Sequence, residues 1–190
     1  LSVEHSFNRI TVDGDMSTND TVLMLANGVA GNPVLRSGTD DFERFQRGLD
    51  HVTLSLAKMI VDDGEGVTKF VEVHVNGAAS FSDARRACEA IAKSCLVKCA
   101  WFGGDPNWGR IMDALGYSGI RMREELVDIY YEGVLAVKGG LASETPMETL
   151  KKLVAAERFR VTVDLNLGAA EYNVFTTDLS TDYVVLNMGE

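Results

Sequence analysis

The chain has 190 residues, of which 46% are hydrophobic, and its formal net charge is -10 at pH 7. This size and apolar content allow a substantial core and exclude a disordered chain. The excess of negative charge opposes binding along a nucleic-acid backbone, which requires clustered Lys and Arg. No apolar run reaches the roughly 18 residues of a membrane span, so we expect a soluble, cytoplasmic protein without membrane contact.

A segment from Ser6 to Asp20 gathers side-chain oxygens and amides between a short apolar run and an expected helix. Within it, Asp13, Asp15 and Ser17 have the alternating spacing of a calcium loop. That motif also requires Gly at its sixth position and Glu at its twelfth, and this chain has Thr and Met there. The sequence therefore does not support a calcium site, and it leaves the roles of Asp13 and Asp15 open.

The same segment ends where the apolar pattern predicts a helix over residues 22–26. Asn19 or Asp20 can cap this helix, because a side-chain oxygen there accepts a hydrogen bond from the first turn. The alternative is that the junction presents its polar groups to a ligand. We favour the cap.

The next expected element is an amphipathic helix that begins behind an Asp40 cap and ends near Asp62. Glu43 follows the cap by three residues, and apolar residues recur at steps of three and four. The apolar positions are Phe42, Phe45, Leu49, Val52, Leu56 and Met59. A helix with one apolar face indicates a fold in which helices cover another layer.

A turn follows this helix and carries Glu65 between Gly64 and Gly66. The two glycines let the backbone turn sharply and approach another group closely. Two interpretations of Glu65 stay open. It is either an exposed loop carboxylate or a carboxylate that meets an amine or ammonium group of a ligand.

Apolar and polar residues alternate over residues 71–75 and 159–167, which predicts two strands with one wetter face each. A glycine-containing turn joins the second strand to a further strand over residues 171–176, so we expect a hairpin. Residues 127–131 predict another strand. The expected fold is α/β (α+β), a layered sandwich of helices and sheet with prominent antiparallel strands, and residues 1–190 form a single unit.

The three cysteines, Cys88, Cys95 and Cys99, lie within one helical pattern that also includes Ala84 and Ile91. An odd number of cysteines on one helix suits a reducing compartment better than a disulfide framework. Cys95 and Cys99 could share a helix face and hold a metal. No nearby His completes such a ligand set, so we expect core packing and no metal site.

Two further helices are expected to begin at prolines. Asp105 and Pro106 supply a cap and a first helical position after a glycine-rich turn, and Thr145 and Pro146 open a capping box. The first of these segments is also a near miss to a phosphate loop, with Arg110 where that motif has Lys. Pro106 removes an amide donor, so we favour a structural role here and expect Arg110 to pair with an acidic side chain.

Four segments, taken in order, resemble the ornithine acetyltransferases of arginine biosynthesis. They read SFNRITVDGDMSTNDT from Ser6, GEGVTK from Gly64, DPNWGRI from Asp105 and DYVVLN from Asp182. The match runs along nearly the whole chain, and its first and third segments are long and specific. The resemblance is to the β chain, the C-terminal product when the family's precursor cleaves itself, and implies a fold that a partner α chain completes.

The resemblance implies transfer of an acetyl group from N2-acetylornithine to glutamate through an acetyl-enzyme intermediate. It implies no cofactor, although some members also accept acetyl-CoA as a donor. The family's nucleophile is a Thr that opens the β chain, whose free amine can serve as the base. The α chain supplies oxyanion stabilisation, and the expected assembly is a dimer or larger set of αβ pairs.

Two residues match substrate-contacting positions of the family. Glu65 matches the Glu of a Glu-Gly-x-Thr-Lys motif, and Asn187 matches the Asn of a Tyr-Val-x-Ile-Asn motif. A carboxylate and an amide suit an amino-acid ligand, one facing its ammonium group and the other its carboxylate or side chain. The family's nucleophilic Thr would lie upstream of Leu1, and a substrate-binding Ser or Thr beyond Glu190. We therefore expect truncation at both ends and no catalytic residue in this span.

Two other functions stay open. A self-processing amidohydrolase or aminopeptidase of related architecture would deliver its acyl-enzyme to water rather than to glutamate. A non-catalytic binding or scaffold subunit is suggested by the missing nucleophile.

Overall fold

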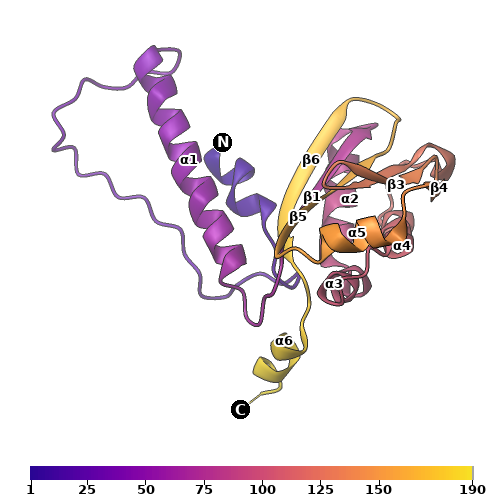
Figure 1. The fold of residues 1–190 in the computed structure, drawn as a ribbon. Coiled ribbons are helices and arrows are strands. Elements are labelled where there is room, and N and C mark those ends of the chain that lie inside the picture. The colour runs from indigo at the N-terminus through magenta and orange to yellow at the C-terminus, as the bar shows by residue number, and fades with distance from the viewer. Residues whose placement is uncertain (190) are drawn as a thin grey trace.

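The computed structural model describes residues 1–189 and is built around a six-stranded sheet of order β4-β3-β2-β5-β1-β6 (Figure 1). The strands are β1 (Phe70–Ala78), β2 (Asp128–Tyr131), β3 (Val134–Lys138), β4 (Leu141–Ala142), β5 (Arg158–Asp164) and β6 (Ala170–Thr177). β1 and β5 are parallel, and every other neighbouring pair is antiparallel. The prediction of mixed α/β structure with prominent antiparallel strands is confirmed.

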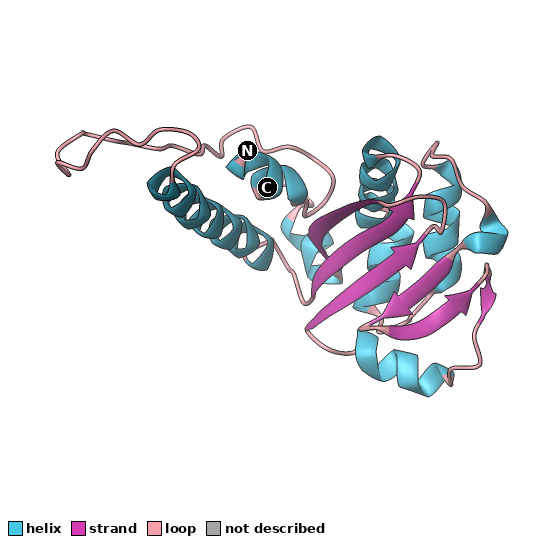
Figure 2. Ribbon diagram, turned by 90° about the horizontal axis from the view of Figure 1, so that it is seen from above, coloured by secondary structure: helices cyan, strands magenta, loops and turns pink. Residues whose placement is uncertain are grey.

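Helices flank this sheet. They are α1 (Asp40–Asp62), α2 (Phe81–Lys93), α3 (Cys95–Phe102), α4 (Trp108–Tyr117), α5 (Met147–Val154) and α6 (Thr181–Leu186), with short 3-10 helices η1 (Ser2–His5), η2 (Phe7–Arg9) and η3 (Glu124–Leu126). α2 to α5 pack with the strands into one core. α1 lies outside that core and contacts the N-terminal 3-10 helices and β6 (Figures 1 and 2). No helix within residues 1–189 is both long and apolar enough to cross a bilayer.

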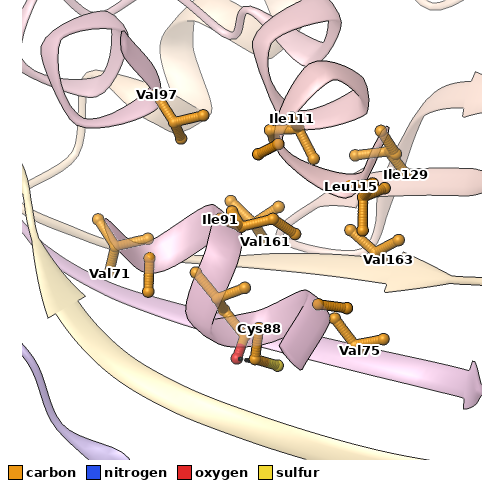
Figure 3. Close-up of a cluster of buried hydrophobic side chains, with 14 of the residues drawn as sticks. Val71, Val75, Cys88, Ile91, Val97, Ile111, Leu115, Ile129, Val161 and Val163 are labelled. Atoms are coloured by element: carbon orange, nitrogen blue, oxygen red, sulfur yellow. Dashed lines mark hydrogen bonds between the residues drawn. The ribbon is translucent and has the colours of Figure 1, made fainter. Parts of the chain in front are cut away.

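One part of the core lies between the sheet and α2. Val71 and Val75 of β1 are fully buried, and Cys88 and Ile91 of α2 pack in the same cluster (Figure 3). Successive strand residues point to opposite faces, so Glu72 and its neighbours of the same parity lie on the other face. Burial of each large aliphatic side chain stabilises the fold by about 1.5–3 kcal/mol.

The predicted hairpin over residues 159–176 is wrong, because β1 lies between β5 and β6. β1 pairs in parallel with β5 and antiparallel with β6. The turn between β5 and β6 instead packs on the end of β1: a Cβ on Gly168 would lie 2.4 Å from the carbonyl oxygen of Ala78. Strand periodicity identifies which residues face the core, but it does not identify the neighbouring strand.

Residues 22–26 do not form the predicted helix, and residues 11–39 contain neither helix nor strand. The N–H groups of Asn19 and Asp20 both donate to Ser17 Oγ. Such side-chain turns satisfy the backbone locally and compete with a helix. The first residues of the segment over residues 6–20 form η2, and Ile10 makes an isolated bridge to Phe175 of β6.

Three caps differ from the sequence prediction, although their helices form. Thr39, rather than Asp40, caps α1, and Asn107, rather than Asp105, caps α4. The hydroxyl of Thr145 donates to a β3 carbonyl group, so the expected capping box at α5 does not form. In α1 and α4 a neighbouring polar side chain accepts the capping hydrogen bond, and in α5 a distant carbonyl group binds the hydroxyl that was expected to cap.

The predicted helix through the three cysteines is two helices, separated at Ser94. Cys88 on α2 is buried, and burial raises the pKa of its thiol. Cys95 and Cys99 on α3 are exposed, so the prediction that both pack in the core is wrong. Among the described residues, no group of three His, Cys, Asp or Glu side chains is placed to hold a metal ion.

Candidate functional site

Glu65 and Asn187 lie side by side, although 122 positions separate them in the chain. Asn187 Nδ2 donates to Glu65 Oε2 at 2.7 Å. Both side chains are exposed. The structure thus brings together the two positions that match substrate-contacting motifs, at the place where the α1–β1 loop meets the C-terminal segment.

The loop that carries Glu65 is shaped by Gly66. This glycine has φ +64, a left-handed conformation that disfavours other residues. A Cβ at this position would lie 2.5 Å from the backbone nitrogen of Tyr183 at the start of α6. Only a glycine therefore allows the loop and the helix to approach this closely.

Ser180 joins the same loop to α6. Its hydroxyl donates to the carbonyl oxygen of Gly66 at 2.6 Å and accepts a hydrogen bond from the N–H of Tyr183 at 3.0 Å. The second bond is an N-terminal helix cap. One side chain thus both begins α6 and attaches that helix to the loop of Glu65.

The buried carboxylate of Asp178 holds the C-terminal end of the loop. Asp178 Oδ1 accepts hydrogen bonds from the N–H groups of Thr68 and Lys69 at 3.0 and 2.9 Å, and Oδ2 accepts the hydroxyl hydrogen of Thr68. Hydrogen bonds to a charged acceptor are roughly twice as strong as neutral ones. The loop is therefore fixed to the segment that follows β6.

A buried lysine lies beneath this segment. Lys98 on α3 is 2% exposed, and its Nζ donates to both Oγ1 atoms of Thr176 and Thr177 at 3.1 Å and to the Thr177 carbonyl group. Burial lowers the pKa of Lys98 to about 8, and the charge of Asp178 opposes that shift. The ammonium group fixes the end of β6, and Asp178 is the next residue along the chain.

Asp13 is hydrogen-bonded to α6. This contact gives a structural role to a residue whose role the sequence left open. Its Oδ2 accepts a hydrogen bond from Tyr183 Oη at 2.9 Å. This bond raises the pKa of Tyr183 to about 12, because an ionised phenol would lose it and face the carboxylate charge. Asp15 contributes a backbone N–H to the other oxygen of Asp13 at 2.9 Å.

A cavity of about 330 Å³ opens beside these groups. It is lined by Val12, Asp13, Asp20, Ile60, Asp63, Gly64, Glu65 and Tyr183. Four of these residues carry carboxylates, so the cavity has a negative potential that favours cationic groups. Its volume is at the lower end of the range found for small-molecule sites.

Arg110 lies in the first turn of α4, and Asp105 lies just before that helix. Arg110 donates to the carbonyl oxygen of Leu96 at 2.6 Å, so the prediction that it pairs with an acidic side chain is wrong. Asp105 accepts a hydrogen bond from Asn107 Nδ2 at 3.0 Å. These contacts support the structural interpretation of the glycine-rich turn.

The model of the ArgJ family matches residues 1–189. The chain belongs to the ArgJ family. It is 53% identical over 96% of its length to an arginine biosynthesis bifunctional protein ArgJ of Geobacter sulfurreducens, and 47% identical over 97% to a glutamate N-acetyltransferase of Methanocaldococcus jannaschii. In both comparisons the chain spans 47% of the relative's length. The family indicated by the four sequence segments is confirmed.

A solved ArgJ structure shares the fold. The crystal structure of the ArgJ protein from Bacillus halodurans has a TM-score of 0.93 and 39% sequence identity. The match covers 100% of this chain and 89% of that one. The six-stranded sheet and its helices are thus the architecture of an ArgJ protein.

Proposed function

We propose that this chain forms the β-chain part of a glutamate N-acetyltransferase of arginine biosynthesis. The reaction would transfer the acetyl group of N2-acetylornithine to glutamate, giving ornithine and N-acetylglutamate. Membership of the ArgJ family and the names of its relatives support this proposal. The structural observation that carries it is the meeting of Glu65 and Asn187 beside an acidic cavity.

The contacts of Asn187 indicate what the pair would bind. Asn187 Nδ2 donates both to Glu65 and to the carbonyl oxygen of Tyr183, at 2.7 and 3.0 Å. Both partners are acceptors, which fixes the amide orientation and leaves Oδ1 as its other polar atom. Glu65 Oε1 and Asn187 Oδ1 are then two neighbouring acceptors. We propose that together they bind an ammonium group of the amino-acid substrate, rather than dividing ammonium and carboxylate between them.

The acetyl-transfer steps in this proposal follow the family resemblance. The hydroxyl of the β chain's N-terminal Thr would attack the acetyl carbonyl group while the Thr amine accepts the hydroxyl proton. Collapse of the tetrahedral adduct would release ornithine, which takes that proton. The amine of glutamate would then attack the carbonyl carbon of the acetyl-Thr ester and lose a proton to the Thr amine. Cleavage of the ester C–O bond would release the Thr oxygen, which takes that proton, and would give N-acetylglutamate. Donors on the α chain would stabilise the oxyanion in both halves of the reaction.

The exposed apolar face of α1 supports the proposal that a partner chain binds there. Phe45, Val52, Leu56 and Met59 are between 44% and 61% exposed, although they form the apolar stripe of this helix. The end of this stripe borders a cavity of about 880 Å³ together with Phe7 and residues 21–23. Helices with such a stripe bury it against another element. The relatives are about twice as long, so we propose that the other half of the precursor, the α chain, covers this face.

An assay with and without glutamate tests the proposed reaction in the complete αβ protein. With N2-acetylornithine present, formation of N-acetylglutamate that depends on glutamate supports acetyl transfer. Ornithine release that ignores glutamate would support the amidohydrolase alternative instead. Acetyl-CoA in place of N2-acetylornithine tests the second donor.

Protein chemistry tests the scaffold alternative. N-terminal sequencing and intact mass of the purified β chain should show a Thr at its start in an active preparation. An active preparation whose β chain begins at Leu1 would contradict the acetyl-threonine mechanism.

A further inference from the structure

Helix α6 carries Asn187 at its C-terminal end and has no buried residue. Its apolar side chains Val184, Val185 and Leu186 are 54%, 62% and 62% exposed. Six residues are too few for a helix that is stable by itself in water. The ribbon also places α6 away from the sheet, at the end of the chain (Figure 1). Apolar burial within this chain therefore does little to fix the position of Asn187.

Side-chain hydrogen bonds attach α6 to the rest of the chain at three places. Ser180 binds the Gly66 carbonyl group, Tyr183 binds Asp13, and Asn187 binds Glu65. The bond of Asn187 belongs to the proposed substrate site itself. The other two attach the helix through groups that lie outside the proposed pair of Glu65 and Asn187.

Tyr183 has the central place among these contacts. Its carbonyl oxygen accepts hydrogen bonds from both the backbone N–H and the side-chain Nδ2 of Asn187, at 3.1 and 3.0 Å. Its hydroxyl donates to Asp13 Oδ2. One residue thus connects the Asn187 amide directly to a segment outside the helix.

The segment that receives the Tyr183 hydroxyl is itself anchored to the sheet. Beside Asp13, the carbonyl oxygen of Val12 lies 3.2 Å from Thr177 Oγ1 and shares its hydroxyl hydrogen with the carbonyl oxygen of Asp178, at 2.9 Å. The N–H of Thr11 donates to the carbonyl oxygen of Phe175 on β6 at 3.0 Å. Asp13 is therefore attached to a strand of the central sheet.

We propose that Tyr183 is a positioning residue, whose hydroxyl bond to Asp13 holds α6 so that Asn187 stays against Glu65. This inference rests on the proposed function, because it assumes that Glu65 and Asn187 contact substrate. Tyr183 acts through Asn187. Its removal should therefore weaken substrate binding without changing the chemistry of acetyl transfer.

The test is Tyr183→Phe in the complete αβ protein, which deletes one hydroxyl and keeps the ring. Loss of a hydrogen bond to a carboxylate predicts a rise of about tenfold in KM for N2-acetylornithine. kcat should stay within about twofold, since the transition-state contacts are retained. Tyr117→Phe is the matched control, because Tyr117 lies exposed on α4 and should leave both constants unchanged.

A double-mutant comparison separates positioning from a general structural role. In an Asn187→Ala background, Tyr183→Phe should raise KM no further, because the residue that it positions is gone. Asp13→Asn should raise KM to a similar extent as Tyr183→Phe, and the two together should be less than additive. The thermal midpoint should be the same in all of these variants.

Three results would overturn the inference. They are an unchanged KM in Tyr183→Phe, an equal rise of KM in the Asn187→Ala background, or a KM rise that only accompanies a lower thermal midpoint. If Glu65→Ala and Asn187→Ala raise KM but Tyr183→Phe does not, the proposed site stands and only the positioning role fails. If all three variants keep wild-type kinetics, the proposed site fails and the positioning role fails with it.

Discussion

Glu65 extends from a loop whose backbone is held at two places directly after this residue, at Gly66 by Ser180 and at Thr68 and Lys69 by Asp178. The loop is held by its own backbone groups, and the Glu65 side chain is exposed. The backbone position of Glu65 is thus fixed, although its side chain does not stabilise the core. It is typical of a residue that serves a ligand, because binding groups are most effective when their position is set in advance.

We predict that Glu65→Ala raises KM for N2-acetylornithine or lowers turnover while folding stays intact. Loss of a charged hydrogen-bond partner costs about 1.5–3 kcal/mol, which is roughly ten- to a hundredfold in kcat/KM. Glu144→Ala is the control, because this exposed carboxylate lies on the loop before α5. Steady-state kinetics and thermal unfolding check the prediction, and wild-type kinetics in Glu65→Ala would remove this residue from the site.

The buried Lys98 leads to a prediction about how the stability of the fold depends on pH. Its pKa falls from 10.5 to about 8 on folding, so between these values the unfolded chain binds more protons than the folded chain. The free energy of unfolding therefore rises with pH over this range, by up to roughly 3 kcal/mol from this group. Relative to Lys98→Met, the wild-type protein should gain stability between pH 8 and pH 10.5.

Urea unfolding at several pH values checks this gain as a difference between wild type and variant. The exposed Lys152 provides the control, since Lys152→Met should differ from wild type by the same amount at each pH. A wild-type advantage over Lys98→Met that shrinks as the pH rises would show that Lys98 stays charged in the folded protein.

At the scale of elements, local pattern predicted α1 well because 3.6-residue periodicity continues over its whole length. The positions of β1 and β5 were also predicted from a local pattern, because successive side chains of a strand point to opposite faces of the sheet. The hairpin was wrong because strand pairing depends on β1, which lies far away in sequence. The helix over residues 22–26 was wrong because Ser17 satisfies the backbone in a turn.

The contact between the Glu65 loop and α6 predicts a specific effect of Gly66→Ala. A non-glycine residue at positive φ costs about 1–2 kcal/mol, and the added Cβ would also collide with the Tyr183 nitrogen, 2.5 Å away. We expect a lower free energy of unfolding and a raised KM, because α6 must move. Gly28→Ala is matched: Gly28 also has positive φ, but no atom lies within 4 Å of its added Cβ.

The comparison of these two glycine variants separates backbone strain from displacement of α6. Gly28→Ala should lose stability alone and keep the wild-type KM. If Gly66→Ala behaves in the same way, the close approach of loop and helix has no role in substrate binding.

For the whole molecule, the site depends on segments that are remote in sequence and that only the fold brings together. Glu65 and Asn187 were predicted because each lies in a recognisable motif. Tyr183 and Asp178 were not, because their partners lie more than 100 positions away.

The burial of Lys98 could have been predicted from the sequence, because it is the one charged residue of an eight-residue helix that is otherwise apolar or cysteine. Such a lysine is buried only when polar groups surround its ammonium.

The exposed stripe of α1 makes the last prediction, which concerns assembly. If the α chain covers this face, a charge placed there must be buried without a partner and should prevent association. Leu56→Lys and Met59→Lys change two exposed apolar positions to a residue of good helix propensity, so α1 itself should still form. Arg44→Gln changes an exposed polar position of the same helix and is the control.

After co-expression with a tagged α chain, the control should co-purify at wild-type yield, whereas the two Lys variants should lose the partner and the acetyl-transfer activity. Full recovery of partner and activity in both Lys variants would place the α chain on another face of the molecule.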